Sequence, residues 1–157
     1  MSLLNRKIAD ALDGGTTDRP LSVVDAPHVV TLDLTSASPA GVAFHRLDFA
    51  VEGAAERSID ELTDWGNRLA ARLTYLMETL VVLETDPLGG EVELRSRTPT
   101  PRGGKRSYYE LRLRRNVSLS LVRVAYDEST RRRETIPCQL TREALERLVD
   151  DLVALAV

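Results

Sequence analysis

The sequence has 157 residues, of which 43% are hydrophobic and 29% charged, and its formal net charge is −3. This length suits one domain, and the composition is that of an ordinary folded protein, which excludes a wholly disordered chain. A negative net charge disfavours nucleic-acid binding by the molecule as a whole unless its charges are segregated. We therefore expect a single domain over residues 1–157, with few aromatic residues in its core because these make up only 4%.

The first element expected along the chain is a short helix. Apolar residues recur at helical spacing over residues 2–12, and Asp13 followed by two glycines ends the pattern. Residues 16–27 are punctuated by Pro and Asp, which indicates a loop that contains a short strand at residues 21–24.

Two strands should follow this loop. Apolar and polar residues alternate over residues 30–34, which is the pattern of a half-buried strand, and a turn around Pro39 comes next. Residues 42–52 form the second strand, but the phase of its apolar set changes part-way. A β-bulge near His45 would explain the change.

A long central helix is expected from Ser58 to about Thr79. Ser58 and Glu61 have the spacing of a capping box, in which each side chain accepts from a backbone N–H of the other residue. A heptad-like apolar stripe follows, formed by Ile59, Leu62, Gly66, Leu69, Leu73, Leu76 and Leu80. Such a stripe fits a helix lying on a sheet, which its length favours, or a seam shared with another molecule.

The second half of the chain is expected to consist mainly of strands joined by turns. Thr98–Ser107 between two of them is rich in Pro, Gly and basic residues, which predicts a mobile loop. Short connections imply an antiparallel meander. The strands are expected at residues 80–85, 91–97, 108–115, 117–126 and 133–138.

A C-terminal helix should begin after Thr141, which is a plausible N-cap, and bury a stripe of leucines. The predicted fold class is therefore α+β: a mainly antiparallel meander sheet with an N-terminal, a long central and a C-terminal helix on one face. The helix-free face should be polar and carry the outward Arg and Glu side chains.

No catalytic, cofactor or metal site is predicted. His28 and His45 each have an Asp nearby in the sequence, but no nucleophile motif accompanies them. One Cys and two distant His residues do not make a zinc site. Cys138 fits a small buried apolar residue better than a reactive thiol, which would need stabilisation of its thiolate by the nearby arginines.

Basic residues are concentrated in the second half of the chain. The segment Arg95–Arg133 has a charge of +9, whereas the remaining residues have a charge of −12. Glu91, Glu93 and Glu110 share the predicted face and could neutralise part of this surface by cross-strand pairing. The candidate binding residues are Arg95, Arg97, Arg102, Lys105, Arg106, Arg112, Arg114, Arg131, Arg132 and Arg133.

Three functional hypotheses follow. The first is a non-enzymatic protein-interaction or small chaperone-like domain that forms a homodimer or binds another protein, since acidic helices and a basic sheet suit electrostatic pairing. Small acidic α+β chaperones of secretion systems have a broadly similar chain order in their first half, which is an analogy of architecture without a shared motif.

The second hypothesis is nucleic-acid binding through the basic sheet and loop of residues 95–133, although aromatic stacking platforms are few. The third is an enzyme with an unusual site in a pocket. A single cysteine, no signal-like start and no apolar stretch near the ~20 residues that span a bilayer lead us to expect a cytoplasmic protein without membrane contact.

Overall fold

The computed structural model describes residues 1–15 and 20–156, so part of the loop expected at residues 16–27 lies outside the described residues. The described chain forms three α-helices, a short 3-10 helix (η1) and ten strands. The helical elements are α1 (Leu3–Asp13), α2 (Ile59–Arg72), η1 (Thr74–Leu76) and α3 (Arg142–Leu155).

All strand pairs within the described residues are antiparallel and belong to one sheet. Its main order is β1-β2-β3-β8-β7-β5-β4, while β10 pairs with β3, β6 with β7 and β9 with β8. The strands are β1 (Leu21–Asp25), β2 (His28–Ala37), β3 (Gly41–Val51), β4 (Leu80–Asp86), β5 (Glu91–Ser96), β6 (Thr100–Arg102), β7 (Lys105–Arg114), β8 (Ser118–Asp127), β9 (Arg132–Ile136) and β10 (Cys138–Thr141).

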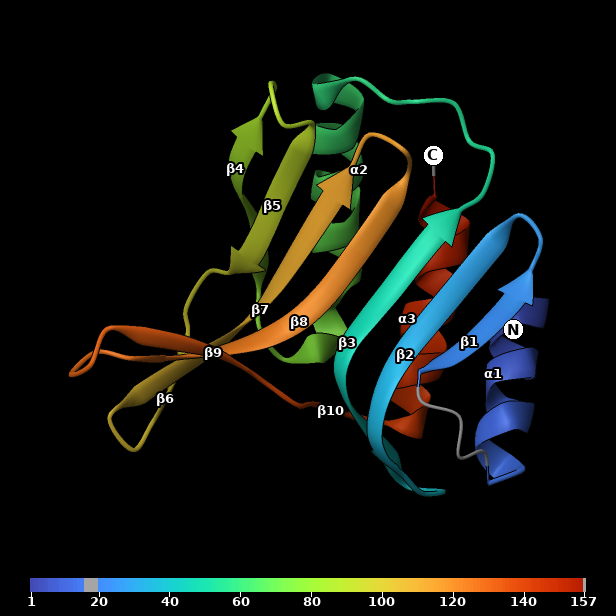
Figure 1. Cartoon of the computed structure of the whole chain (residues 1–157), viewed down its shortest axis with the longest axis horizontal. Coiled ribbons are helices and arrows are strands. Elements are labelled where there is room, and N and C mark those ends of the chain that lie inside the picture. Colours follow the sequence, from blue (N-terminus) through green and yellow to red (C-terminus); the bar gives the residue numbers. More distant parts are fainter. Residues whose placement is uncertain (16–19, 157) are drawn as a thin grey trace.

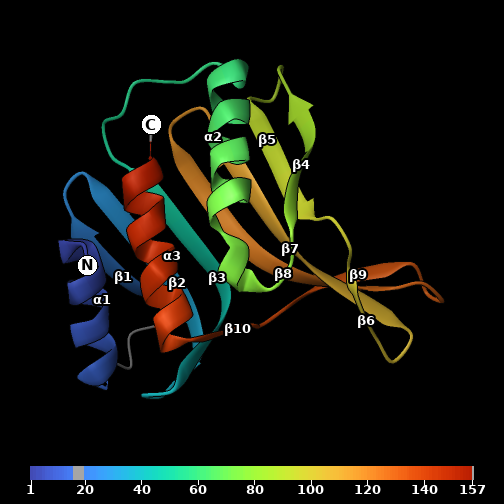
Figure 2. The same cartoon turned by 180° about the vertical axis from the view of Figure 1, so that it is seen from behind.

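The helices cover one face of this sheet, and the opposite face carries none of them (Figure 1; Figure 2). α1 packs on β1 and β2, α3 on β3 and β10, and α2 on β4, β5 and β7. The α+β class with an antiparallel sheet and an N-terminal, a central and a C-terminal helix is thus confirmed. Among the described helices, none has the length and apolar character needed to cross a membrane.

The central helix confirms one prediction and corrects another. Ser58 caps α2, with its Oγ 3.1 Å from the N–H of Glu61, and the capping box is complete. The apolar stripe faces the molecule's own sheet, and Gly66 comes so close that an added Cβ would lie 3.1 Å from Leu94. The helix nevertheless ends at Arg72 and not near Thr79, because the chain tightens into η1 there.

The predicted β-bulge also exists. Leu32 pairs with Leu47 and Leu34 with Phe44, so two residues of β3, His45 and Arg46, oppose one residue of β2. The extra residue restores the inward phase of the apolar side chains on both sides of the bulge. Leu47 and Phe44 are accordingly both buried.

Two predictions in the basic region are wrong. Thr98–Ser107, expected to be a loop, contains the hairpin of β6 and β7, whose turn is Gly103-Gly104 with φ of 56° and 79°. Such positive φ angles suit a two-residue hairpin turn. The strand expected at residues 133–138 is two strands, because Pro137, which cannot donate to a ladder, separates β9 from β10.

The two hairpins of this region form a projecting part of the sheet. The ends of β6 and β7, and of β8 and β9, extend beyond the helices as a four-stranded projection (Figure 1; Figure 2). We call this projection, residues 100–107 and 124–136, the arm. β8 pairs with β3 only up to Leu121 and with β9 from Arg123 onward, so the sheet divides at the root of the arm.

Candidate functional site

The predicted basic surface does not form one continuous positive patch. Four of its arginines lie on the helix-free face beside glutamates from β5 and β7, within 3.5 Å of a carboxylate oxygen. The pairing follows from strand register, which places Glu91 opposite Arg114, Glu93 opposite Arg112, and Arg95 opposite Glu110. We call this the sheet-face network; its members are Arg95, Arg112, Arg114, Arg133, Glu91, Glu93 and Glu110.

Two carboxyl groups at the centre of this network are buried although no helix covers them. Glu93 and Glu110 are only 8% and 7% exposed. Burial, together with a hydrogen bond to Glu110, raises the pKa of Glu93 to about 7. Burial also opposes ionisation of Glu110, but the hydrogen bond from Glu93 and the guanidinium of Arg112 outweigh it, so the pKa of Glu110 is lowered.

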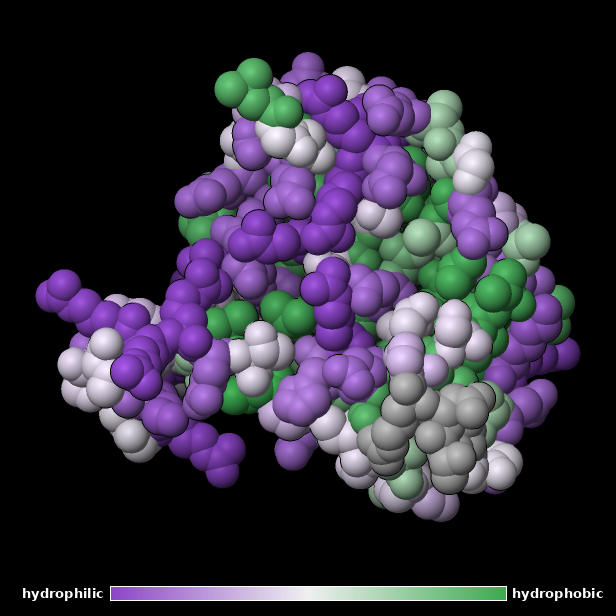
Figure 3. Space-filling model, in the orientation of Figure 1, coloured by the Kyte–Doolittle hydropathy of each residue, from purple (hydrophilic) through white to green (hydrophobic). Residues whose placement is uncertain are grey.

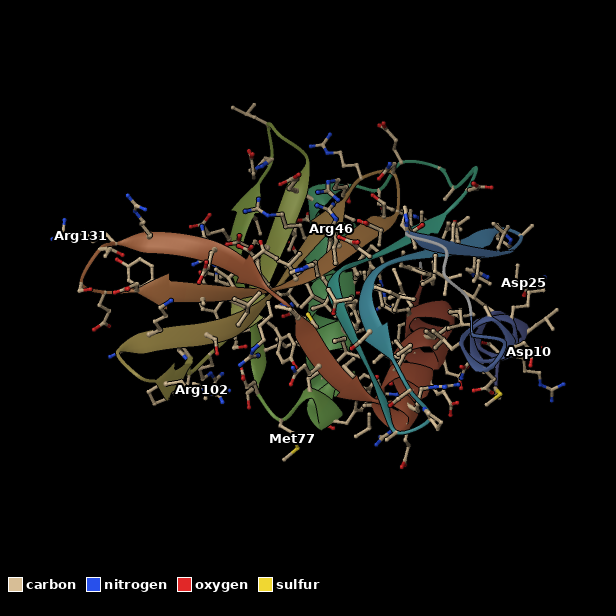
Figure 4. The ribbon with its side chains drawn as sticks, turned by 60° about the horizontal axis from the view of Figure 1, so that its bottom comes forward. Asp10, Asp25, Arg46, Met77, Arg102 and Arg131 are labelled. Carbon is tan, nitrogen blue, oxygen red and sulfur yellow. The ribbon has the colours of Figure 1, made fainter. Side chains whose placement is uncertain are left out.

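The arm carries the remaining predicted basic residues except Arg97, which lies between β5 and β6. Lys105 lies 3.4 Å from Glu134, and Arg106 lies 3.0 Å from Glu128. Figure 4 shows Arg131 at the far end of the arm and Arg102 on its other hairpin. Four predicted basic side chains make no ion pair with a described residue, and these are Arg97, Arg102, Arg131 and Arg132.

A hollow of about 480 Å³ lies where the arm meets the body, on the side of the sheet that the helices occupy. Figure 3 views the opposite, helix-free face, where hydrophilic atoms predominate on the arm and on the neighbouring part of the sheet. Pockets of this size hold small ligands or side chains of a partner. We call it the arm hollow; it is lined by Glu78, Thr100, Arg102, Lys105, Ser107, Tyr109, Arg123, Ala125, Glu134, Ile136, Pro137 and Gln139.

One wall of the arm hollow contains a nearly buried ion pair. Nη2 of Arg123 donates to Oε2 of Glu78 over 2.7 Å and to Oγ of Ser107 over 2.9 Å. The guanidinium lies 4.5 Å from the ring centroid of Tyr109, in cation–π geometry. Burial raises the pKa of Tyr109, although Arg123 opposes this. The polar side chains of this wall are thus bonded mainly to each other.

Sequence reasoning missed Arg123 as a site residue. It stands two residues after Leu121 and four after Leu119, so strand alternation places it on the inward face of β8. That parity was the available signal. An inward arginine in an apolar strand needs an acidic partner, and Glu78, from the segment before β4, supplies it.

Comparisons with protein-family models, with curated proteins and with solved structures give no match.

The other residues considered for chemistry lie outside the arm hollow. Cys138 is fully buried, and burial raises the pKa of its thiol to about 12, so it packs as a small apolar residue. His28 stacks on Phe49, with ring centroids 5.9 Å apart. Asp48, near His45 in the sequence, pairs with Arg46 at 2.9 Å. No cluster of three metal-ligating side chains occurs among the described residues.

Proposed function

We propose that this chain is a non-enzymatic protein-binding domain with a small chaperone-like role, which receives its partner at the arm hollow. The observation that carries the proposal is the combination, in one concave site, of apolar walls with a cation that makes no ion pair with a described residue. Ala125, Ile136 and Pro137 supply apolar surface, and Arg102 supplies the unpaired charge. A site of this kind suits a partner that buries an apolar side chain and pairs a charge at the rim.

The edges of the sheet support binding through side chains in preference to strand addition. Lys7 Nζ donates to the carbonyl of Val24 over 3.0 Å and so occupies an outward acceptor on β1. β4 has a register irregularity at Leu83, and β6 contains Pro101. Charged side chains, bulges and prolines are the usual means of protecting sheet edges from pairing. The edge strand β9 is protected by charge in the same way, since it begins with Arg132-Arg133.

A second candidate function, nucleic-acid binding, is favoured by the unpaired cations of the arm. Three of the four tyrosines, however, are already covered by the molecule's own arginines: Tyr108 by Arg95, Tyr109 by Arg123 and Tyr75 by Arg147. Single-strand binders need free aromatic faces on which bases stack. Each sheet-face arginine also lies close to a glutamate. The phosphate contacts of this alternative are therefore the four predicted basic side chains without an ion pair to a described residue, Arg131 among them.

The partner can be another protein or a second copy of the chain. We propose that the chain is located in the cytoplasm, because its one cysteine is a free thiol. Light scattering coupled to gel filtration, at low and high salt, gives the mass of the protein alone. The same measurement is made with reduced, carboxymethylated α-lactalbumin, a permanently unfolded acidic protein, and with a short oligothymidylate.

The proposal expects a complex with the unfolded protein that weakens in the Ile136→Asp variant, and no complex with the oligothymidylate. A salt-sensitive complex with the oligothymidylate that is lost in Arg131→Glu would support the second candidate. Absence of any complex with the unfolded protein would contradict the first.

A further inference from the structure

The arm hollow has a neighbouring hollow on the same molecule. A second hollow of about 520 Å³ adjoins it, and the two share Tyr109 and Gln139 in their walls. Met77, whose side chain is almost fully exposed, lies on the second hollow. Figure 4 shows Arg102 and Met77 on the same underside of the molecule, on the arm and on the body respectively. Two hollows that share wall residues fit several residues of an extended chain better than one compact ligand.

Apolar side chains line both hollows. Ile136 and Pro137, where the chain passes from β9 to β10, line the arm hollow, and both are only partly buried. Met77 adds a flexible apolar side chain of the type that adapts to varied partners. An incoming leucine or a similar side chain could therefore be shielded from water here at little cost in rearrangement.

The side chains that line the arm hollow carry more positive than negative charge. Its lining contains three basic side chains and two acidic ones. Arg123 pairs with Glu78, with a nitrogen–oxygen distance of 2.7 Å, and Lys105 pairs with Glu134 at 3.4 Å. Arg102 has no such partner among the described residues. The unpaired Arg131 and Arg132 lie further along the same arm. Like charges repel, so this setting disfavours a basic segment.

We infer that the paired hollows bind an extended acidic protein segment, which places an apolar side chain on Ile136 and Pro137 and a carboxylate on Arg102 and Lys105. This inference rests on the proposed function and specifies the chemistry of the partner. A carboxylate at the rim gains a charge-assisted hydrogen bond from Arg102 and competes with Glu134 for Lys105, whose present contact is long. The Arg123–Glu78 pair needs no counter-charge from the segment.

The test uses two capped octapeptides, one alternating leucine with glutamate and the other alternating leucine with lysine. Each is titrated to millimolar concentration into the ¹⁵N-labelled full chain, and backbone amide shifts report both affinity and position. We expect the glutamate peptide to shift amides at Arg102, Lys105, Ile136 and Gln139, and to bind about tenfold more tightly than the lysine peptide.

Two variants test whether Arg102 binds the carboxylates of the glutamate peptide. Arg102→Glu should weaken binding of the glutamate peptide by about tenfold, whereas Arg131→Glu should leave it within about twofold, because Arg131 is equally unpaired but lies outside the lining. Arg102 is exposed, so neither change should alter the fold, and circular dichroism checks this. Ile136→Ser tests the apolar contact and should also weaken binding.

The outcomes separate this inference from the proposed function. Equal binding of both peptides at the hollows would overturn the acidic segment and leave protein binding intact. Shifts confined to the sheet-face network, or an equal effect of Arg131→Glu, would overturn the site. If unfolded α-lactalbumin binds and neither peptide does, only the inference of an acidic segment is contradicted. If neither the peptides nor α-lactalbumin bind, both the inference and the proposed function are contradicted.

Discussion

Nη2 of Arg123 lies 2.7 Å from Oε2 of Glu78, and this ion pair fastens β8 to the segment that leads into the edge strand β4. The two side chains are only 14% and 11% exposed. Thr100 of β6 donates to the same oxygen of Glu78 over 3.0 Å, so the pair also holds the arm against the body. The wall of the arm hollow thus depends on residues from three distant parts of the chain.

Removing one member of this pair should be more harmful than removing both. Arg123→Met leaves the carboxylate of Glu78 nearly buried without its counter-ion, and we expect it to lower the free energy of unfolding by about 3 kcal/mol. The double variant Arg123→Met with Glu78→Leu should recover most of this loss. Urea unfolding of the wild type, both single variants and the double variant gives the coupling. Simple addition of the two single effects would show that the pair does not act as a unit.

The main outline of the fold could be predicted because local signals decide it. Ser58 and Thr141 cap α2 and α3 where the sequence places them, since a hydroxyl followed three residues later by a free N–H is a local arrangement. Strand alternation also places Leu111 and Leu113 on one face of β7, and both are buried. The pairing of Glu93 with Arg112 depends on strand register, which local patterns in the sequence do not determine.

The site was harder to predict because it forms where local rules change. The turn Gly103-Gly104 carries a hairpin signal, but prolines and basic residues around it resemble an irregular loop. Pro137 marks a place where one extended run changes its partner from β8 to β3, and only the whole sheet determines that change. The nearness of Glu78 to Arg123 is likewise a product of the fold, since 45 residues separate them.

The buried carboxyl pair should make stability depend on pH. Because the pKa of Glu93 is raised to about 7, the folded chain holds this proton more tightly than the unfolded chain does. Its stabilising contribution is complete below the usual pKa of a glutamic acid and is lost as pH rises through about 7. Glu93→Gln keeps an uncharged hydrogen-bond donor, so it should be more stable than the wild type at about pH 8 and show a flatter profile from about pH 5.

Thermal unfolding across this pH range measures the effect of Glu93→Gln. Glu52→Gln is the matched control, because Glu52 is exposed and its carboxylate makes no ion pair with a described residue. The profile of the control should follow the wild type. A decline in Glu93→Gln as steep as that of the wild type would exclude Glu93 as the source of the pH dependence.

Replacing Gly66 with alanine should destabilise the protein, even though alanine is the better helix former. An added Cβ would lie 3.1 Å from Leu94, 3.2 Å from Val82 and 3.3 Å from Leu113, closer than ordinary contact. Alanine gains about 1 kcal/mol of helix propensity, whereas overpacking a core costs about 1–3 kcal/mol. We expect a net loss of about 1 kcal/mol in Gly66→Ala, measured by urea unfolding. A gain would mean that these methyl groups move aside freely.

The capping box of α2 should contribute to stability through its acceptor oxygen. Oγ of Ser58 accepts from the N–H of Glu61 over 3.1 Å, and Oε1 of Glu61 accepts from the N–H of Ser58 over 3.1 Å. Ser58→Ala removes the first of these bonds and leaves a helix N–H without its partner, so the free energy of unfolding should fall by about 1 kcal/mol. Ser58→Asp restores an acceptor at the same place, beside the positive end of the helix dipole, and should retain most of the stability. Urea unfolding of both variants checks this, and an equal loss in the two would mean that the serine hydroxyl stabilises the helix by something other than capping.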